Sequence, residues 1–370
     1  MYCDVSSTAS NSKNFDLDKT KATKIVELIF QSPARDITIE FQGGEPTLNM
    51  DVLKYIVKYT RELNKFHNKN ISFLLVTNLN NMDQEKREYL ISHNINICTS
   101  LDGPKKLHDF NRPYPKGSAS SYDPVIKQIK EFNNAYKKRG LNNTVSALLT
   151  ISKESLKDPL GIIDTYIDNG FTDIHLRPLT RLGCAASDWN KIGYTSEEFI
   201  EFLKVALDYI LELNKKGINI QERLISIMLG KIKSIPTNYM DLRIPCGAVI
   251  GQLAYNYDGN IYSCDEARFT NNQEFKVGNL DNNYSEIMKS PKTCKIIKAS
   301  INDIDPCNKC KFKDYCGLCP VCTYSEQGDL IGDIKKTPRC KINFFMFSYI
   351  LDKYYNDIEI KNILDRWVVW

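Results

Sequence analysis

The feature that most constrains this chain is an array of cysteines in its C-terminal part. Eight of the twelve cysteines belong to it, and its densest stretch has the spacing Cys-x2-Cys-x5-Cys-x2-Cys-x2-Cys. Two thiolates two residues apart can reach one metal from a tight turn, and more distant cysteines complete four-coordination. The array therefore predicts metal binding. Its members are Cys246, Cys264, Cys307, Cys310, Cys316, Cys319, Cys322 and Cys340.

The expected cellular compartment favours metal over disulfides. The start of the sequence is polar and lacks the apolar stretch of a secretory signal. No apolar run approaches the ~20 residues of a membrane span. We therefore expect a cytoplasmic protein without membrane association, in which reducing conditions disfavour disulfides. The net charge of +4, from 49 basic and 45 acidic residues, is too balanced to indicate a nucleic-acid partner.

Strand-like and helix-like segments alternate over roughly the first half of the chain, joined by short connections. This order predicts parallel strands covered by helices, in a barrel or a doubly wound sheet, and we favour an open, partial parallel βα barrel. Strands are expected over residues 36–41, 71–76, 95–101, 144–151 and 173–179. Helices are expected over residues 21–30, 52–66, 84–93, 122–139 and 160–169.

Polar residues follow several of the predicted strands. The first strand runs into Gln42, Gly43, Gly44, Glu45 and Pro46, where two glycines free the backbone to approach a ligand and Glu45 offers a carboxylate to an ammonium group. Parallel strands end at one rim, where α/β folds place their sites. Each of these segments by itself also suits an ordinary turn. The later strand ends carry Thr77 and Asn78, then Ser100 and Asp102.

The last predicted strand has one polar face. Alternation places Asp173, His175 and Arg177 on one side, and Ile174 and Leu176 on the other. A polar inner face predicts a wet cavity inside a barrel, whereas an exposed edge strand would show the same pattern.

Taken together, these motifs resemble those of the radical S-adenosylmethionine enzymes. The resemblance rests on Phe-Gln-Gly-Gly-Glu-Pro after a strand, Val-Thr-Asn after the next, and Ser-Leu-Asp-Gly-Pro followed by His108 and Asn111-Arg112. It implies that Gly43, Gly44 and Glu45 contact the amino group of the cofactor's methionine part. It also implies that the residues at the later strand ends border cofactor and substrate.

The family's defining motif is Cys-x3-Cys-x2-Cys, which holds a [4Fe–4S] cluster with one iron open to the cofactor. By resemblance, Cys3 matches the third cysteine of this motif, with Tyr2 before it, and the first two would lie upstream of Met1. One thiol cannot hold the cluster. The chain as written is therefore expected to be inactive unless an upstream segment or another chain supplies the missing ligands.

The cysteine array resembles the SPASM domain of peptide-modifying radical enzymes, which commonly holds two auxiliary [4Fe–4S] clusters. By this resemblance, the first cluster would use Cys246, Cys264 and Cys322. Cys319 is either its fourth ligand or a replacement for Cys322. The second cluster would use Cys307, Cys310, Cys316 and Cys340. Without the resemblance, two zinc sites of four cysteines each would suit the array as well.

Asp265 follows Cys264 directly, and some SPASM enzymes have their catalytic base at this place. The resemblance extends over about residues 3–345, and residues 245–259 with the tryptophan-rich end resemble the His-Xaa-Ser system maturases more narrowly. We expect a barrel over residues 1–190, a helical bridge over 191–244, the SPASM domain over 245–345 and a helical tail over 346–370.

The resemblance implies an oxidoreductase that modifies a ribosomally made peptide or protein. A 5′-deoxyadenosyl radical would abstract hydrogen from a side chain, and the auxiliary clusters would take up an electron or anchor the substrate. A flavodoxin or ferredoxin would supply electrons. The alternative is a non-catalytic iron–sulfur or zinc subunit that binds peptides, derived from such an enzyme by loss of the N-terminal motif.

Overall fold

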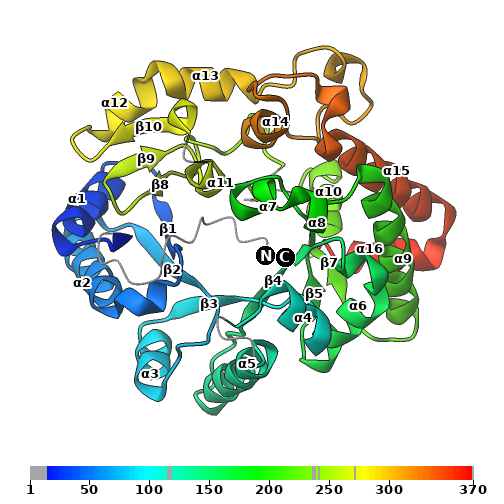
Figure 1. Ribbon diagram of the computed structural model, residues 1–370, viewed down its shortest axis with the longest axis horizontal. Helices are drawn as coiled ribbons and strands as arrows, with labels where there is room; N and C mark the ends of the chain where they lie inside the picture. Colours follow the sequence, from blue (N-terminus) through cyan, green and yellow to red (C-terminus); the bar gives the residue numbers. More distant parts are fainter. Residues whose placement is uncertain (1–14, 115–118, 236–238, 241, 271, 369–370) are drawn as a thin grey trace.

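The computed structural model describes residues 15–114, 119–235, 239–240, 242–270 and 272–368. Its main element is a five-stranded sheet in the order β1-β2-β3-β4-β6, in which every neighbouring pair is parallel. The strands form an arc that does not close on itself (Figure 1). The predicted open, partial βα barrel is therefore confirmed. Its strands are β1 (Asp36–Phe41), β2 (Asn70–Thr77), β3 (Ile95–Ser100), β4 (Ser146–Ile151) and β6 (Leu176–Pro178).

Amphipathic helices cover the outer side of the arc (Figure 1). On β1, Ile39 and Phe41 pack into a core with residues of the first two helices, such as Val26 and Val57. The residues between them on β1 therefore face the inside of the arc, because successive strand side chains point to opposite faces. The helices of this half are α1 (Lys19–Phe30), α2 (Met50–His67), α3 (Gln84–Ser92), α4 (Lys105–Asn111), α5 (Tyr122–Lys138) and α6 (Pro159–Asp168).

The single strand predicted over residues 173–179 is divided in two. Its first part, β5 (Asp173–Ile174), pairs with β7 (Gln221–Glu222), while β6 continues the main sheet. The carboxylate of Glu222 is the cause: this fully buried residue accepts a hydrogen bond of 3.1 Å from the backbone N–H of Leu176. The two parts of the strand thus follow different partners.

A second layer of helices shares its core with the barrel. Helix α9 contacts α6, α15 and α16, and it begins with a capping box in which the side chain and backbone of Thr195 bond reciprocally with Glu198. Phe199 and Phe347 lie in this common core, so the tail packs back on the body. The helices are α7 (Gly183–Ser187), α8 (Trp189–Ile192), α9 (Ser196–Lys215), α10 (Arg223–Ile232), α15 (Pro338–Asn356) and α16 (Ile358–Arg366).

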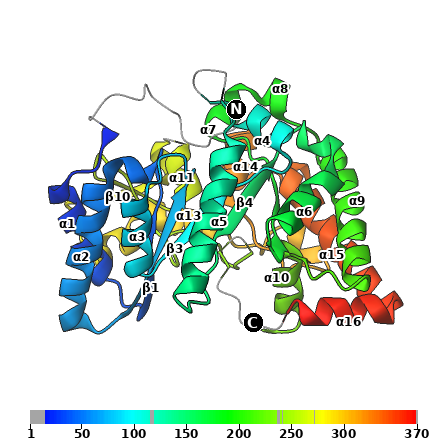
Figure 2. The same ribbon diagram turned by 90° about the horizontal axis from the view of Figure 1, so that it is seen from below.

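The cysteine-rich region is a separate structural layer that faces the inner side of the arc (Figures 1 and 2). It contains an antiparallel sheet of β8 (Ala254–Tyr255), β9 (Asn260–Tyr262) and β10 (Lys276–Asn279). Its helices are α11 (Asp265–Phe269), α12 (Tyr284–Lys289), α13 (Pro291–Ala299) and α14 (Pro320–Gln327). A small core built around Tyr262, Phe275 and Val321 holds it together. The domain limits at residues 190, 244 and 345 stay predictions.

Short 3-10 helices complete the described part of the chain. They are η2 (Pro46–Asn49), η3 (Ser155–Lys157), η4 (Gln273–Phe275), η5 (Cys307–Lys309) and η6 (Ile334–Lys336). Within the described ranges, no helix combines the length and the hydropathy that crossing a lipid bilayer requires.

The hydroxyl of Tyr194 offers a test of how the barrel strands are held. It donates to the carbonyl of Ile151 at 3.0 Å and accepts from the N–H of Leu179 at 2.7 Å, so it bridges the ends of β4 and β6. Tyr194→Phe leaves both backbone groups without this partner, and we expect it to lower the free energy of unfolding by about 1–3 kcal/mol. Urea unfolding followed by circular dichroism measures the loss.

The matched control is Tyr209→Phe, which removes a hydroxyl bonded to the carboxylate of Asp164 on a half-buried helix surface. We expect a change below about 0.5 kcal/mol, as for most surface substitutions. Equal losses in the two variants would show that the bridge between β4 and β6 contributes nothing specific.

Candidate active site and cluster-binding region

The parallel register brings three of the predicted polar segments to one rim of the arc. Phe41, at the end of β1, pairs with Leu75, and Thr77, at the end of β2, pairs with Thr99 of β3. The loops that follow these strands therefore start side by side. The expectation that the three strand ends share one rim is confirmed.

Glu45 ties the loop after β1 to the end of β2. Its Oε1 accepts from the backbone N–H of Thr47 at 3.0 Å, the Thr47 hydroxyl at 2.6 Å and the Thr77 hydroxyl at 2.8 Å. Its Oε2 accepts from the backbone N–H of Asn78 at 2.8 Å. The carboxylate thus fixes the shape of the rim. Its predicted contact with a ligand ammonium stays a prediction, and Oε2, which carries the smaller load, is the oxygen better able to make it.

Gly43 and Gly44 border open space. A Cβ placed on either residue would meet no heavy atom within 4 Å. The backbone at this strand end is therefore accessible to a ligand, which suits the predicted approach of a cofactor. Pro46 then begins η2, where its missing N–H costs nothing because the first N–H groups of a helix have no partner in the helix.

Asp102 and Thr77 act within the fold at this rim. Asp102 is 0% exposed, and its Oδ2 accepts from Nε of Arg112 at 2.9 Å. Its backbone N–H donates to Nδ1 of His108 at 3.3 Å, and burial lowers the pKa of His108 to about 4, so the ring is a neutral acceptor. This network holds α4 against the end of β3. Ser100 is half-buried beside it, and binding roles for these residues stay predictions.

Carboxylates line the inner side of the arc. Glu40 lies on the inner face of β1, and its surroundings raise the pKa of its carboxyl, first through desolvation and then through the negative charge of Asp265. Asp265 begins α11, and its Oδ1 accepts from Nε2 of Gln252 at 3.1 Å. The predicted base Asp265 therefore lies near the barrel's inner face.

An ion pair joins the barrel to the cysteine-rich region. Arg177 of β6 donates to Oε1 of Glu266, which is 9% exposed and lies 89 residues further along the chain. The alternation of residues 173–177 predicted a polar inner face for Arg177 but not its partner. Glu266 reaches the cysteines with its other oxygen, Oε2, which is 3.9 Å from Sγ of Cys319.

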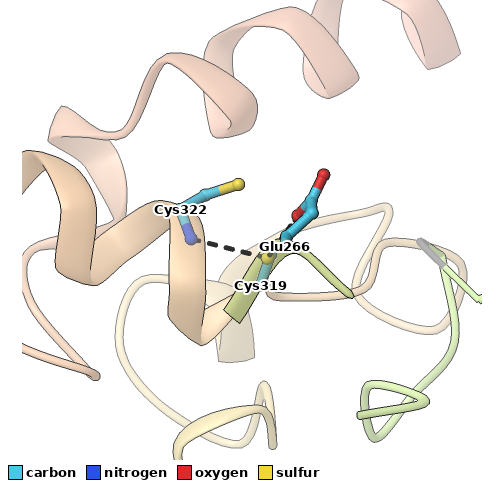
Figure 3. A group of neighbouring side chains, drawn as sticks. All are labelled: Glu266, Cys319 and Cys322. Atoms are coloured by element: carbon cyan, nitrogen blue, oxygen red, sulfur yellow. Dashed lines mark hydrogen bonds between the residues drawn. The ribbon is translucent and has the colours of Figure 1, made fainter. Parts of the chain in front are cut away.

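Cys319 and Cys322 lie together beside Glu266 (Figure 3). The two sulfur atoms and a carboxylate oxygen of Glu266 are all within 4.8 Å of one another. Cys319 caps α14, and its Sγ accepts from the N–H of Cys322 at 3.5 Å. Burial and the charges of Asp265, Glu266 and Cys319 raise the pKa of Cys264, which places Cys264 in the same neighbourhood.

Cys246 and Cys264 belong to the small core of the cysteine-rich region, where Cys319 packs as well. The Sγ of Cys264 caps α11 by accepting from the N–H of Ala267 at 3.3 Å, and the Sγ of Cys246 accepts from the N–H of Ala248 at 3.5 Å. Backbone donors aimed at sulfur stabilise a thiolate. The structure therefore brings Cys319 to the side of Cys264, and Cys322 lies next to Cys319.

The remaining cysteines of the array form a second group. Burial raises the pKa of Cys307 to about 11, and the neighbouring thiols of Cys316, Cys340 and Cys310 contribute to the shift. All four line one cavity of about 270 Å³ that Cys319 and Cys322 also reach. The predicted partition into two groups thus has a spatial counterpart. Cys3, the residue predicted for the radical cluster, lies outside the described residues.

Comparison with known proteins agrees with this geometry. The pattern of the SPASM family, an iron–sulfur cluster-binding domain, matches residues 246–311, and that of a 4Fe-4S single cluster domain matches residues 1–126. A cysteine-type anaerobic sulfatase-maturating enzyme of Clostridium perfringens is 23% identical over 361 residues, which cover 94% of this chain and 90% of the relative.

Two solved structures share the fold. The structure of anSMEcpe with bound AdoMet superimposes with a TM-score of 0.80 at 20% identity, over 99% of this chain and 94% of the other. Streptococcus suis SuiB bound to the precursor peptide SuiA has a TM-score of 0.59 at 16% identity, over 91% of this chain and 70% of the other.

An open parallel barrel whose rim carries a Gly-Gly-Glu loop, faced by a buried cysteine array, defines an α/β enzyme that holds iron–sulfur clusters. The chain belongs to the radical S-adenosylmethionine enzymes and carries a C-terminal SPASM domain.

The Glu45 clamp can be tested with an isosteric change. In Glu45→Gln one position of the side-chain amide must carry NH₂, which then faces the N–H of either Thr47 or Asn78. Two donors cannot bond, so we expect the free energy of unfolding to fall by about 1–3 kcal/mol. We also expect weaker binding of S-adenosylmethionine in equilibrium dialysis. Glu62→Gln, at an exposed pair with Lys65, should cost less than about 0.5 kcal/mol.

The metal content of the array is a second test. Two [4Fe–4S] clusters correspond to about eight irons and eight sulfides per chain. Cys307→Ala combined with Cys310→Ala should halve both values, because one group of ligands is destroyed. Cys294→Ala, at an exposed cysteine outside the array, should leave them unchanged. Zinc without sulfide in the wild-type chain would contradict the iron assignment.

Proposed function

We propose that this chain oxidises a side chain of a peptide or protein by radical chemistry based on S-adenosylmethionine. The observation that carries the proposal is the contact between the barrel and the cysteine array: Arg177 on the inner barrel face pairs with Glu266, which lies beside Cys319 and Cys322. A substrate bound inside the arc would thus lie near the auxiliary cluster ligands. Relatives named as sulfatase-maturating enzymes and a neighbour solved with a precursor peptide support a peptidyl substrate.

We assign cofactor binding to the loop after β1. Gly43 and Gly44 leave space for a ligand beside their backbone, and Glu45 holds the loop in place through its bonds to Thr47, Thr77 and Asn78. When bound with its cluster, S-adenosylmethionine supplies the carbon radical that removes a hydrogen atom from the substrate. Pro46, Ser100 and Asp102 shape the rim around it. A flavodoxin or ferredoxin is the proposed electron donor, and the cytoplasm is the proposed location.

We assign four thiolates to each auxiliary cluster. Both Cys319 and Cys322 join the first cluster, because the two sulfurs lie together and Cys319 is a neighbour of Cys264. Glu266, paired with Arg177, then supports this cluster from outside. The first set is Cys246, Cys264, Cys319 and Cys322. The second set is Cys307, Cys310, Cys316 and Cys340.

Asp265 is the proposed base. It follows Cys264 directly, and its electrostatic influence on Glu40 places it toward the inner barrel face. Oxidation of a substrate carbon after loss of a hydrogen atom releases one electron and one proton. The carboxylate of Asp265 would take the proton, while the first auxiliary cluster is close enough to take the electron. Gln252 orients the carboxylate through its 3.1 Å hydrogen bond.

The activity is tested with the full chain, loaded with iron and sulfide under anaerobic conditions. It is incubated with dithionite, S-adenosylmethionine and peptides that carry a sulfatase-type cysteine or serine. We expect 5′-deoxyadenosine and a peptide that has lost two hydrogens, both measured by mass spectrometry. Cluster-loaded protein that forms no 5′-deoxyadenosine above background would favour the non-catalytic, peptide-binding alternative.

Asp265→Asn separates the two halves of the reaction. The amide cannot accept the proton, so we expect about 10²–10⁴-fold less oxidised peptide. Formation of 5′-deoxyadenosine should persist, because hydrogen removal precedes proton transfer. Asp281→Asn, at an exposed pair with Lys24, is the control and should leave both products unchanged. A variant at position 265 that retains full peptide oxidation would remove this residue from the mechanism.

A further inference from the structure

Two side chains of α15 point at sulfur atoms of different cysteine groups. Nη1 of Arg339 donates to Sγ of Cys322 at 3.3 Å, and Nδ2 of Asn343 donates to Sγ of Cys316 at 3.4 Å. The two residues are four positions apart, so they lie on one face of the helix. Each cysteine group thus receives a side-chain hydrogen bond from the same helix.

This helix is fixed firmly enough to aim both donors. Thr337 caps its first turn by accepting from the N–H of Cys340, which is itself a member of the second group. On the opposite side Ile342, Met346 and Phe347 are buried in the core shared with α9. Arg339 and Asn343 are half-buried and buried, and both line the cavity that the six clustered cysteines share.

We propose that Arg339 and Asn343 are positioning residues that set the reduction potentials of the two auxiliary clusters, Arg339 for the first and Asn343 for the second. The inference rests on the proposed ligand sets. A cluster held by thiolates becomes more negative by one charge when it takes up an electron. Hydrogen bonds to its sulfurs stabilise that reduced form and raise the potential.

The two donors differ in strength. The guanidinium of Arg339 is charged, and a charge-assisted hydrogen bond is roughly twice as strong as a neutral one such as that from the Asn343 amide. Arg339 also lies near Cys316 and Glu326, so its charge acts mainly, but not solely, on the first cluster. The cluster nearer to Asp265 and the substrate therefore receives the stronger bias toward accepting an electron.

The test is a potentiometric titration of the full, anaerobically reconstituted chain with dithionite, in which the EPR signal of each cluster is followed as it takes up one electron. Arg339→Met removes both charge and donor. We expect the equilibrium constant for reduction of the first cluster to fall about tenfold, which is about 59 mV for a one-electron couple. The second cluster should shift less. Arg339→Gln, which keeps a neutral donor, should recover part of the loss.

Asn343→Leu should lower the equilibrium constant of the second cluster about fivefold and leave the first in place. Lys341→Met is the matched control, because it removes a charge from the same helix at an exposed site paired with Glu197. We expect it to move neither potential.

Iron and sulfide contents, measured first, separate this inference from the ligand assignment. Wild-type protein without clusters would overturn both. Fully loaded variants with unchanged potentials, or with equal shifts of both clusters from either substitution, would overturn the tuning role alone. Loss of one cluster in both Arg339→Met and Arg339→Gln would show that Arg339 retains iron rather than tuning it.

Discussion

Parallel pairing of successive strands is the constraint on which the site depends. Because β1, β2 and β3 run the same way in neighbouring positions, the segments that follow them start at a common rim. A single carboxylate, Glu45, can then reach groups from two strands at once. The chemistry proposed for the rim is thus a product of topology, because Gly43 and Thr77 are far apart along the chain.

Charge pairing connects the two halves of the molecule. The barrel contributes Arg177 and the cysteine-rich region contributes Glu266, and neither charge would be stable in this partly buried place without the other. The pair fixes how the first cysteine group lies relative to the inner barrel face. Its geometry therefore bears on substrate oxidation even though neither residue is assigned a chemical step.

Local patterns in the sequence predicted most of the barrel, since periodicity and turn residues mark β1 to β4 and the helices between them. They failed where structure depends on distant partners. The break before Leu176 arises from Glu222, and short helices such as α4 form on contacts such as Asp102 with Arg112 that no local pattern reveals. For the cysteines, spacing alone predicted a metal site, whereas the proximity of Cys319 to Glu266 required the fold.

Helix α15 carries a consequence for folding. One face bears Cys340, Arg339 and Asn343, and the other supplies Phe347 to the core beneath α9. Ligand binding that occurs only in the folded state adds its free energy to the stability of everything it holds. The supply of iron and sulfide would therefore govern how long the barrel itself survives, and cells short of iron would lose the whole protein rather than an inactive form of it.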